Sequence, residues 1–335
     1  EIGAWNTTAE DFFFKDKANE LRPQMYKDLG LEVEASNLCN EIQLHSSPEY
    51  TYSCILASMN LVHWDHLKES DDIFNATVFL DCVTEDFIQM SEGIPGLEKV
   101  REFTIKGRAI GLGAMGFHTY LQSKGIPFES LEAQFLANDM AKRIQSESLR
   151  ASQYLAELKG EPEWCKGYGV RNTHRIAYAP TKSSALLMGG VSESWSPDPG
   201  MVFEMASSVG ELRRIPPVFY EKMKEKGVYN EETITDIINH SGSVQHVDWL
   251  TEEEKQVFRN AYEVDQFVIL RHASQRQRHT CQGQSLNFFV ADQGSEPLIA
   301  ELMSEVFKDP YILGQYYLYS KSGVVVPEDC VACSA

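Results

Sequence analysis

Residues 36–42 read Ser36-Asn37-Leu38-Cys39-Asn40-Glu41-Ile42, and this stretch carries the most weight in assigning the fold and chemistry of the chain. Successive side chains of an extended segment point to opposite faces, so we expect Asn37, Cys39 and Glu41 to share one side. An amide, a thiol and a carboxylate would then be able to hydrogen-bond a hydroxyl, exchange a hydrogen atom and accept a proton. The plainer alternative is a surface-edge strand with an incidental cysteine.

The composition is that of an acidic globular protein. The 335 residues include 49 Asp and Glu against 30 Lys and Arg, which gives a formal net charge of −19. Such a surface repels nucleic acid polymers, although a local pocket could still bind a nucleotide. There is no apolar run of the roughly 18 residues that a membrane span needs and no signal-peptide pattern, so we expect a cytoplasmic protein.

Hydrophobic periodicity indicates an α/β fold. Apolar residues at three-to-four spacing predict a helix over about 131–158, and a second long helix is predicted over about 251–271, where Thr251 precedes three glutamates. Short apolar runs at 175–178 and 285–290 predict buried strands. After about Gly323 the periodicity stops, which indicates a mobile tail.

The seven cysteines, at positions 39, 54, 82, 165, 281, 330 and 333, do not indicate a disulfide framework. One thiol cannot deliver two electrons through an internal disulfide, so Cys54 is either half of a reducing pair or an ordinary core thiol. Cys330 and Cys333 form a CxxC near the end of the chain. Redox exchange is the favoured interpretation over half a zinc site, because no second CxxC or close histidine pair completes four ligands. We therefore expect no metal ligands.

Three other motifs have both a functional and a structural interpretation. The turn Pro180-Thr181-Lys182-Ser183-Ser184 suits phosphate at a helix start, but a simple N-cap is commoner. Residues 111–116 match GxGxxG without the preceding hydrophobic strand of a dinucleotide fold, so close helix packing is the better interpretation of these glycines. Tyr316 and Tyr317 are either core or interface aromatics, or adjacent phenols able to relay an electron and a proton.

In this order, the motifs resemble those of one family, the large catalytic (alpha) subunit of class I (aerobic) ribonucleotide reductase. The resemblance runs from about residue 34 to the C-terminus, and phage members are the most similar. Its strongest matches are Ser36–Ile42, Arg108–Gly116, Ala179–Ser184 and Gln284–Asn287, followed by the tyrosine pair and the terminal cysteines. The family implies an α/β fold, namely the second half of a ten-stranded α/β barrel with flanking helices and a flexible C-terminal tail.

The resemblance also implies roles for individual residues in reducing ribonucleoside diphosphates to 2′-deoxyribonucleoside diphosphates. Cys39 resembles the thiyl-radical cysteine that removes the ribose 3′ hydrogen atom. Glu41 resembles the general base for the 3′-hydroxyl, and Asn37 the amide that holds the ribose hydroxyls. Cys54 resembles one member of the pair that becomes a disulfide as the 2′-hydroxyl leaves as water.

Other positions imply partners. Tyr316 and Tyr317 resemble the relay that carries the radical from a small, metal-containing subunit, and this chain itself is expected to bind no cofactor. Cys330 and Cys333 resemble the tail pair that thioredoxin or glutaredoxin resets. The loop from Pro180 to Ser184 resembles the binding site of the substrate diphosphate.

The family's catalytic subunit is about twice the length of this chain, and its first half carries the allosteric sites and the partner of Cys54. We therefore expect the C-terminal half of a split subunit, with a separate N-terminal half as an obligate partner. The expected segments are an N-terminal extension at 1–33, the barrel half at 34–322 and a mobile redox tail at 323–335. The rivals are a cobalamin-dependent or glycyl-radical relative, a stand-alone thiol–disulfide oxidoreductase, and a non-catalytic scaffold.

Overall fold

Five extended segments run parallel to one another and follow each other in chain order. The computed structural model describes residues 12–53, 55–207, 210–290 and 295–320. Its strands are β1 (Phe12–Phe13), β2 (Leu56–Asn60), β3 (Gly111–Met115), β4 (Phe203–Ser207), β5 (Gly210–Arg214), β6 (Phe288–Val290), β7 (Gly314–Gln315) and β8 (Leu318–Ser320). Strand β2 pairs with β3, and β6 pairs with β8, both in parallel. Parallel bridges from Leu112 to Ile176 and from Tyr178 to Gln284 join the two pairs through the expected strand near 175–178.

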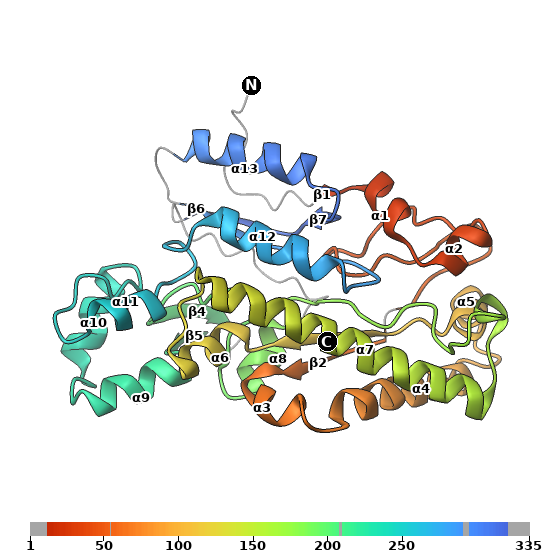
Figure 1. Cartoon of the computed structure of the whole chain (residues 1–335), viewed down its shortest axis with the longest axis horizontal. Coiled ribbons are helices and arrows are strands. Elements are labelled where there is room, and N and C mark those ends of the chain that lie inside the picture. The colour runs from red at the N-terminus through yellow and green to blue at the C-terminus, as the bar shows by residue number, and fades with distance from the viewer. Residues whose placement is uncertain (1–11, 54, 208–209, 291–294, 321–335) are drawn as a thin grey trace.

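Helices connect these strands, as parallel pairing requires. They are α1 (Lys15–Leu21), α2 (Gln24–Asp28), α3 (Trp64–Leu67), α4 (Asp72–Met90), α5 (Glu98–Gly107), α6 (Phe117–Lys124), α7 (Leu131–Lys159), α8 (Lys182–Leu187), α9 (Pro217–Glu225), α10 (Glu231–Asn239), α11 (Glu252–Val257), α12 (Gln266–Gln277) and α13 (Glu296–Lys308). Figure 1 shows α12 above α7 and α4 below it, and both helices contact α7. The alternation of strands and helices confirms the predicted α/β class.

The predicted helix over 131–158 is confirmed as α7. Ser130 caps its first turn by accepting a hydrogen bond from the Ala133 amide, and Met140 and Ile144 on its apolar stripe are fully buried. This stripe packs against α4 and α12. The main core therefore lies between these helices and the parallel strands.

The prediction of one continuous helix over 251–271 is wrong, because this region forms two helices. The Thr251 cap is confirmed, with a reciprocal capping box to Glu254, but α11 ends at Val257 and α12 begins only at Gln266. Between them the Ala261 amide donates to the Asp198 carbonyl instead of to its own helix. Asp265 then caps α12 at the Phe267 amide. A tertiary contact and a new cap therefore interrupt the helix that periodicity predicts.

The glycines at 111–116 pack strands together. A Cβ atom on Gly113 would lie 2.7 Å from the Ala177 carbonyl oxygen, and one on Gly111 would lie 3.1 Å from the Ala177 Cβ. The close packing that we predicted is present, but the neighbours are strands and not helices. No dinucleotide loop follows from this motif.

The segment from residue 12 to residue 33 packs against the rest of the chain. Strand β1 pairs antiparallel with β7, and Lys17 donates to the Val306 and Asp309 carbonyls. Tyr26 is fully buried in a second core cluster with Trp164. The boundary at residue 33 stays a prediction, although this segment is integrated into the fold.

A smaller core cluster includes Phe219 and Met223 of α9 and Ile234 and Ile237 of α10, and these two helices lie at one end of the molecule (Figure 1). None of the described helices is both long enough and apolar enough to cross a membrane. Residues 323–335, predicted to be a mobile redox tail, lie outside the described residues.

Candidate functional site

Cys39 lies in a tight turn, which corrects the prediction of an extended strand. The Asn37 amide donates to the Ile42 carbonyl, and the Ile42 amide donates to the Asn37 side-chain oxygen at 3.0 Å. Asn40 has a φ of +66°, a left-handed conformation that asparagine tolerates better than most residues. This residue reverses the chain immediately after Cys39. The alternation of side chains along an extended segment does not predict such a reversal.

The turn nevertheless brings two of the three predicted side chains, Asn37 and Glu41, together. Cys39 and Glu41 are buried, at 6% and 4% exposure, and Asn37 is partly buried. The Asn37 side chain hydrogen-bonds the Glu41 carboxyl group. Asn37 and Glu41 are thus close together, as predicted, but a turn and not an extended segment brings them together.

Ser285 is a site residue that sequence reasoning missed. Its hydroxyl donates a 2.6 Å hydrogen bond to the Cys39 carbonyl and lies 3.2 Å from Glu41 Oε2. The Gly283 amide donates to the Glu41 carbonyl at 2.9 Å. The match at Gln284–Asn287 pointed to this segment, but no spacing rule showed that it would touch the turn.

The turn fits closely between two glycines. A Cβ atom on Gly283 would lie 2.3 Å from the Asn40 carbonyl oxygen, and one on Gly314 would lie 3.0 Å from the Asn40 side-chain oxygen. The Asn40 side-chain nitrogen donates to the Gln315 carbonyl at 2.8 Å. Larger residues at these two glycines would displace the backbone that carries Cys39.

Tyr316 and Tyr317 are anchored on the same segment as Ser285. Their ring centroids are 3.8 Å apart, and the Tyr316 hydroxyl donates to the Tyr317 hydroxyl at 3.0 Å. The Tyr316 amide donates to the Leu286 carbonyl, and the Tyr317 amide to the Asn287 side chain. Residues 284–287 therefore connect the tyrosine pair to the Cys39 turn.

The Glu41 carboxyl has a perturbed pKa. Burial raises this pKa above that of an ordinary glutamate, and hydrogen bonds from Asn37 and Ser285 oppose the increase. A carboxylate of raised pKa is a better proton acceptor than a solvated one.

The loop from Pro180 to Ser184 starts helix α8, as predicted. Thr181 has a φ of +61°, and its hydroxyl accepts a hydrogen bond from the Ser194 amide at 2.8 Å. Lys182, Ser183 and Ser184 are exposed in the first turn. A phosphate role for the loop stays a prediction, as do the roles of Cys54, Cys330 and Cys333, which lie outside the described residues.

A family model described as "Ribonucleotide reductase, barrel domain" matches residues 3–166 and 162–314. The chain belongs to the ribonucleotide reductase large-subunit family. This confirms the resemblance and the barrel fold, and the match begins well before residue 34, where we expected the resemblance to start.

Relatives match over nearly the whole chain but over only part of their own length. A putative ribonucleoside-diphosphate reductase large subunit of Frog virus 3 is 37% identical over 92% of this chain and 55% of its own. The large subunit of Invertebrate iridescent virus 3 is 34% identical, over 82% and 44%. The structure of an Actinobacillus ureae class Id ribonucleotide reductase alpha subunit superposes with a TM-score of 0.86 at 39% identity, over 94% and 58%. The chain spans about half the length of these relatives, which agrees with a C-terminal half.

Proposed function

We propose that this chain reduces ribonucleoside diphosphates to 2′-deoxyribonucleoside diphosphates by thiyl-radical chemistry, as the C-terminal half of a split catalytic subunit in a multi-chain reductase. The observation that carries the proposal is the single segment 284–287, which bonds both the Cys39 turn and the tyrosine pair. A buried thiol, a base and a route for a radical then lie in one continuous structure.

Each residue of the turn has a separate role at the ribose. Cys39, as a thiyl radical, removes the 3′ hydrogen atom, and its burial protects the radical from solvent. Glu41 takes the proton of the 3′-hydroxyl, a task that its raised pKa favours. Asn37 holds the ribose hydroxyls and orients Glu41 through their hydrogen bond.

The tyrosine pair relays the radical. With their hydroxyl oxygens 3.0 Å apart, Tyr316 and Tyr317 are placed to exchange a proton and an electron. The radical originates on a small, metal-containing subunit, and this chain binds no cofactor of its own. A cobalamin-dependent reductase would not need the pair, although one such enzyme, from Thermoplasma acidophilum, is 33% identical to this chain.

Two thiols supply the reducing electrons. Oxidation of Cys54 and a partner thiol to a disulfide releases two electrons and two protons, and the 2′-hydroxyl leaves as water. The partner thiol belongs to the N-terminal half. Cys330 and Cys333 then reduce this disulfide by exchange, and thioredoxin or glutaredoxin reduces the tail.

The proposed substrate site and partner surface are both exposed. The first turn of α8 presents Lys182 and two serine hydroxyls, which suit a diphosphate. Strand β2 pairs on one side with β3, and its Leu56 is 38% exposed. An N-terminal half that added strands beside β2 would cover this edge. The assembled enzyme would act in the cytoplasm.

Reconstitution tests the proposal. CDP reduction is measured with this chain alone and then with the matching N-terminal half, the small subunit and a dithiol. We expect deoxycytidine diphosphate only from the complete mixture. Activity of the chain alone would contradict the need for a missing half. Disulfide reductase activity without partners would favour a stand-alone oxidoreductase, and stable assembly without turnover would favour a scaffold.

A further inference from the structure

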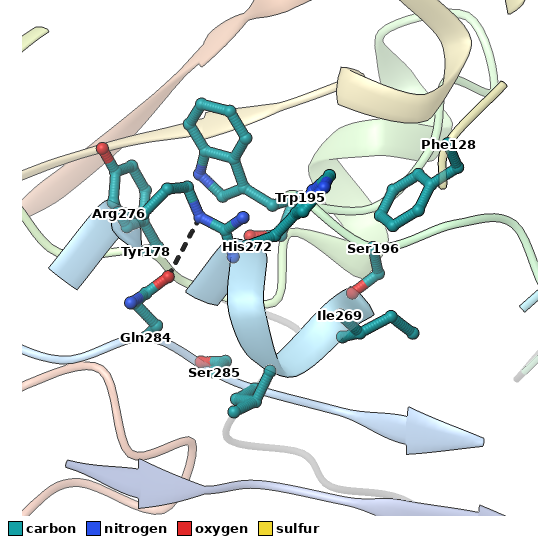
Figure 2. Close-up of a pocket in the computed structure, with 11 residues that line it drawn as sticks. Phe128, Tyr178, Trp195, Ser196, Ile269, His272, Arg276, Gln284 and Ser285 are labelled. Carbon is teal, nitrogen blue, oxygen red and sulfur yellow. Dashed lines mark hydrogen bonds between the residues drawn. The ribbon is translucent and has the colours of Figure 1, made fainter. Parts of the chain in front are cut away.

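A small cavity lies directly behind the Cys39 turn. Its volume is about 20 Å³, enough for one water molecule or one small ion. Ser285, which bonds the Cys39 carbonyl, is part of its lining, together with Trp195, His272 and Arg276. Figure 2 shows the Arg276 guanidinium beside the Trp195 ring, with His272 close to both.

Arg276 is a buried cation without an anionic partner among the described residues. It is 4% exposed, and its Nε donates to Gln284 Oε1 at 3.1 Å, a neutral acceptor. Its Nη1 is buried and bonds no protein atom of the described part. Burial lowers the pKa of Arg276 to about 9, which still leaves the guanidinium charged at neutral pH. An uncompensated buried charge is costly, so a counter-charge at this position would stabilise the fold.

Two further side chains that line the cavity, Trp195 and His272, have buried ring nitrogens without a partner among the described residues. The Trp195 indole nitrogen, which can only donate, is buried and has no partner in the described structure. The guanidinium carbon of Arg276 lies 4.8 Å from the Trp195 ring centroid, so the two groups are adjacent. Both ring nitrogens of His272 are also buried without a partner among the described residues, and Phe128 stacks on this ring at 5.0 Å. Burial lowers the pKa of His272 to about 3, so the neutral ring adds one further donor.

We propose that this cavity binds a monoatomic anion of chloride size, held by Arg276, Trp195 and His272. A water molecule would leave the arginine charge uncompensated. A volume of about 20 Å³ favours a small ligand. The ion would fix the guanidinium that holds Gln284, the residue before Ser285, and would thereby support the Cys39 turn from behind.

Two measurements on the wild-type chain test the proposal. Crystals grown in bromide should show an anomalous peak inside the cavity. The melting temperature should also rise by about 2 °C for each tenfold increase in chloride above its dissociation constant, at constant ionic strength made up with gluconate. Gluconate is the control because it is too large to enter.

Variants identify the ligands. Arg276→Met should lose the chloride dependence, whereas Arg271→Met, an exposed arginine on the same helix, should keep it. Should Arg276→Met not fold, Trp195→Phe removes one donor and keeps an aromatic ring, and should weaken chloride binding about tenfold. A cavity without a bromide peak would overturn the proposal and assign the site to water. Equal melting temperatures of the wild-type chain in chloride and gluconate would overturn it as well.

Discussion

The side-chain nitrogen of Asn40 donates a 2.8 Å hydrogen bond to the backbone carbonyl of Gln315, 275 positions later in the chain. This buried bond joins the residue after Cys39 to the residue before Tyr316. A single hydrogen bond therefore connects the candidate radical cysteine with the candidate relay through their chain neighbours. The geometry of the site depends on contacts of this long range.

Replacing Asn40 should destabilise the whole fold. Asn40→Ala removes the buried bond and places an alanine at a φ of +66°, so we expect a loss of about 1–3 kcal/mol in the free energy of unfolding. Asn40→Gly removes the bond but relieves the backbone strain, and should cost less. Urea denaturation measures both variants. Equal losses would show that the left-handed backbone contributes nothing.

Ser285 should influence the pKa of Glu41, the proposed proton acceptor. Because its hydroxyl bonds the Glu41 carboxylate, Ser285→Ala should raise the Glu41 pKa further. The proposed mechanism requires ionised Glu41, so the rate should fall as the pH drops through this pKa, and in the variant that fall should begin at a higher pH. The pH profile of kcat/KM in the reconstituted enzyme checks the shift. Ser285→Thr keeps the hydroxyl and serves as the control; an unshifted profile in Ser285→Ala would count against the role.

Tyr316→Phe should block the radical relay without disturbing the fold. Only the hydroxyl is lost, and the ring still packs against Tyr317. We expect CDP reduction to fall below detection, while nucleotide binding and the melting temperature stay near those of the wild type. Tyr311→Phe, outside the pair, is the matched control. Retained turnover in Tyr316→Phe would remove this residue from the relay.

The buried carboxylate of Asp81 should make the free energy of unfolding depend on pH. Asp81 is bonded by Arg108 at 2.9 Å and by Arg171 at 3.1 Å. Burial alone would raise the Asp81 pKa, but the hydrogen bond and charge of Arg108, with help from Arg171, lower it overall. A depressed pKa contributes stability above the unfolded value near 3.9, and this stability is lost as the pH falls through the folded value.

Asp81→Asn should accordingly cost about 3 kcal/mol at pH 7, because Arg171 and Arg108 lose the Asp81 charge and only Arg108 keeps a second carboxylate, Glu85. The difference in unfolding free energy between wild type and variant should shrink as the pH is lowered below about 4. Urea denaturation across this range is the measurement. A difference that is constant with pH would mean that packing, and not charge, explains the loss.

Local patterns in the sequence were enough to predict α7, the Thr251 cap and the buried strands, because each depends on near neighbours. The extended segment from which we argued at Cys39 is a turn, since the left-handed Asn40 is held in place by Gln315 from the other end of the chain. Ser285 was missed for the same reason. The break before α12 depends on Asp198, whose contact with Ala261 has no signature in local periodicity.

The most direct test of the central claim is CDP reduction by the complete enzyme with Cys39→Ser in place of the wild-type chain. Serine is nearly isosteric, so assembly and nucleotide binding should persist, as they should in the exposed control Cys82→Ser. We predict that Cys39→Ser abolishes deoxycytidine diphosphate formation while Cys82→Ser leaves it unchanged. Continued turnover by an intact Cys39→Ser complex would contradict the assignment of Cys39 as the reacting centre.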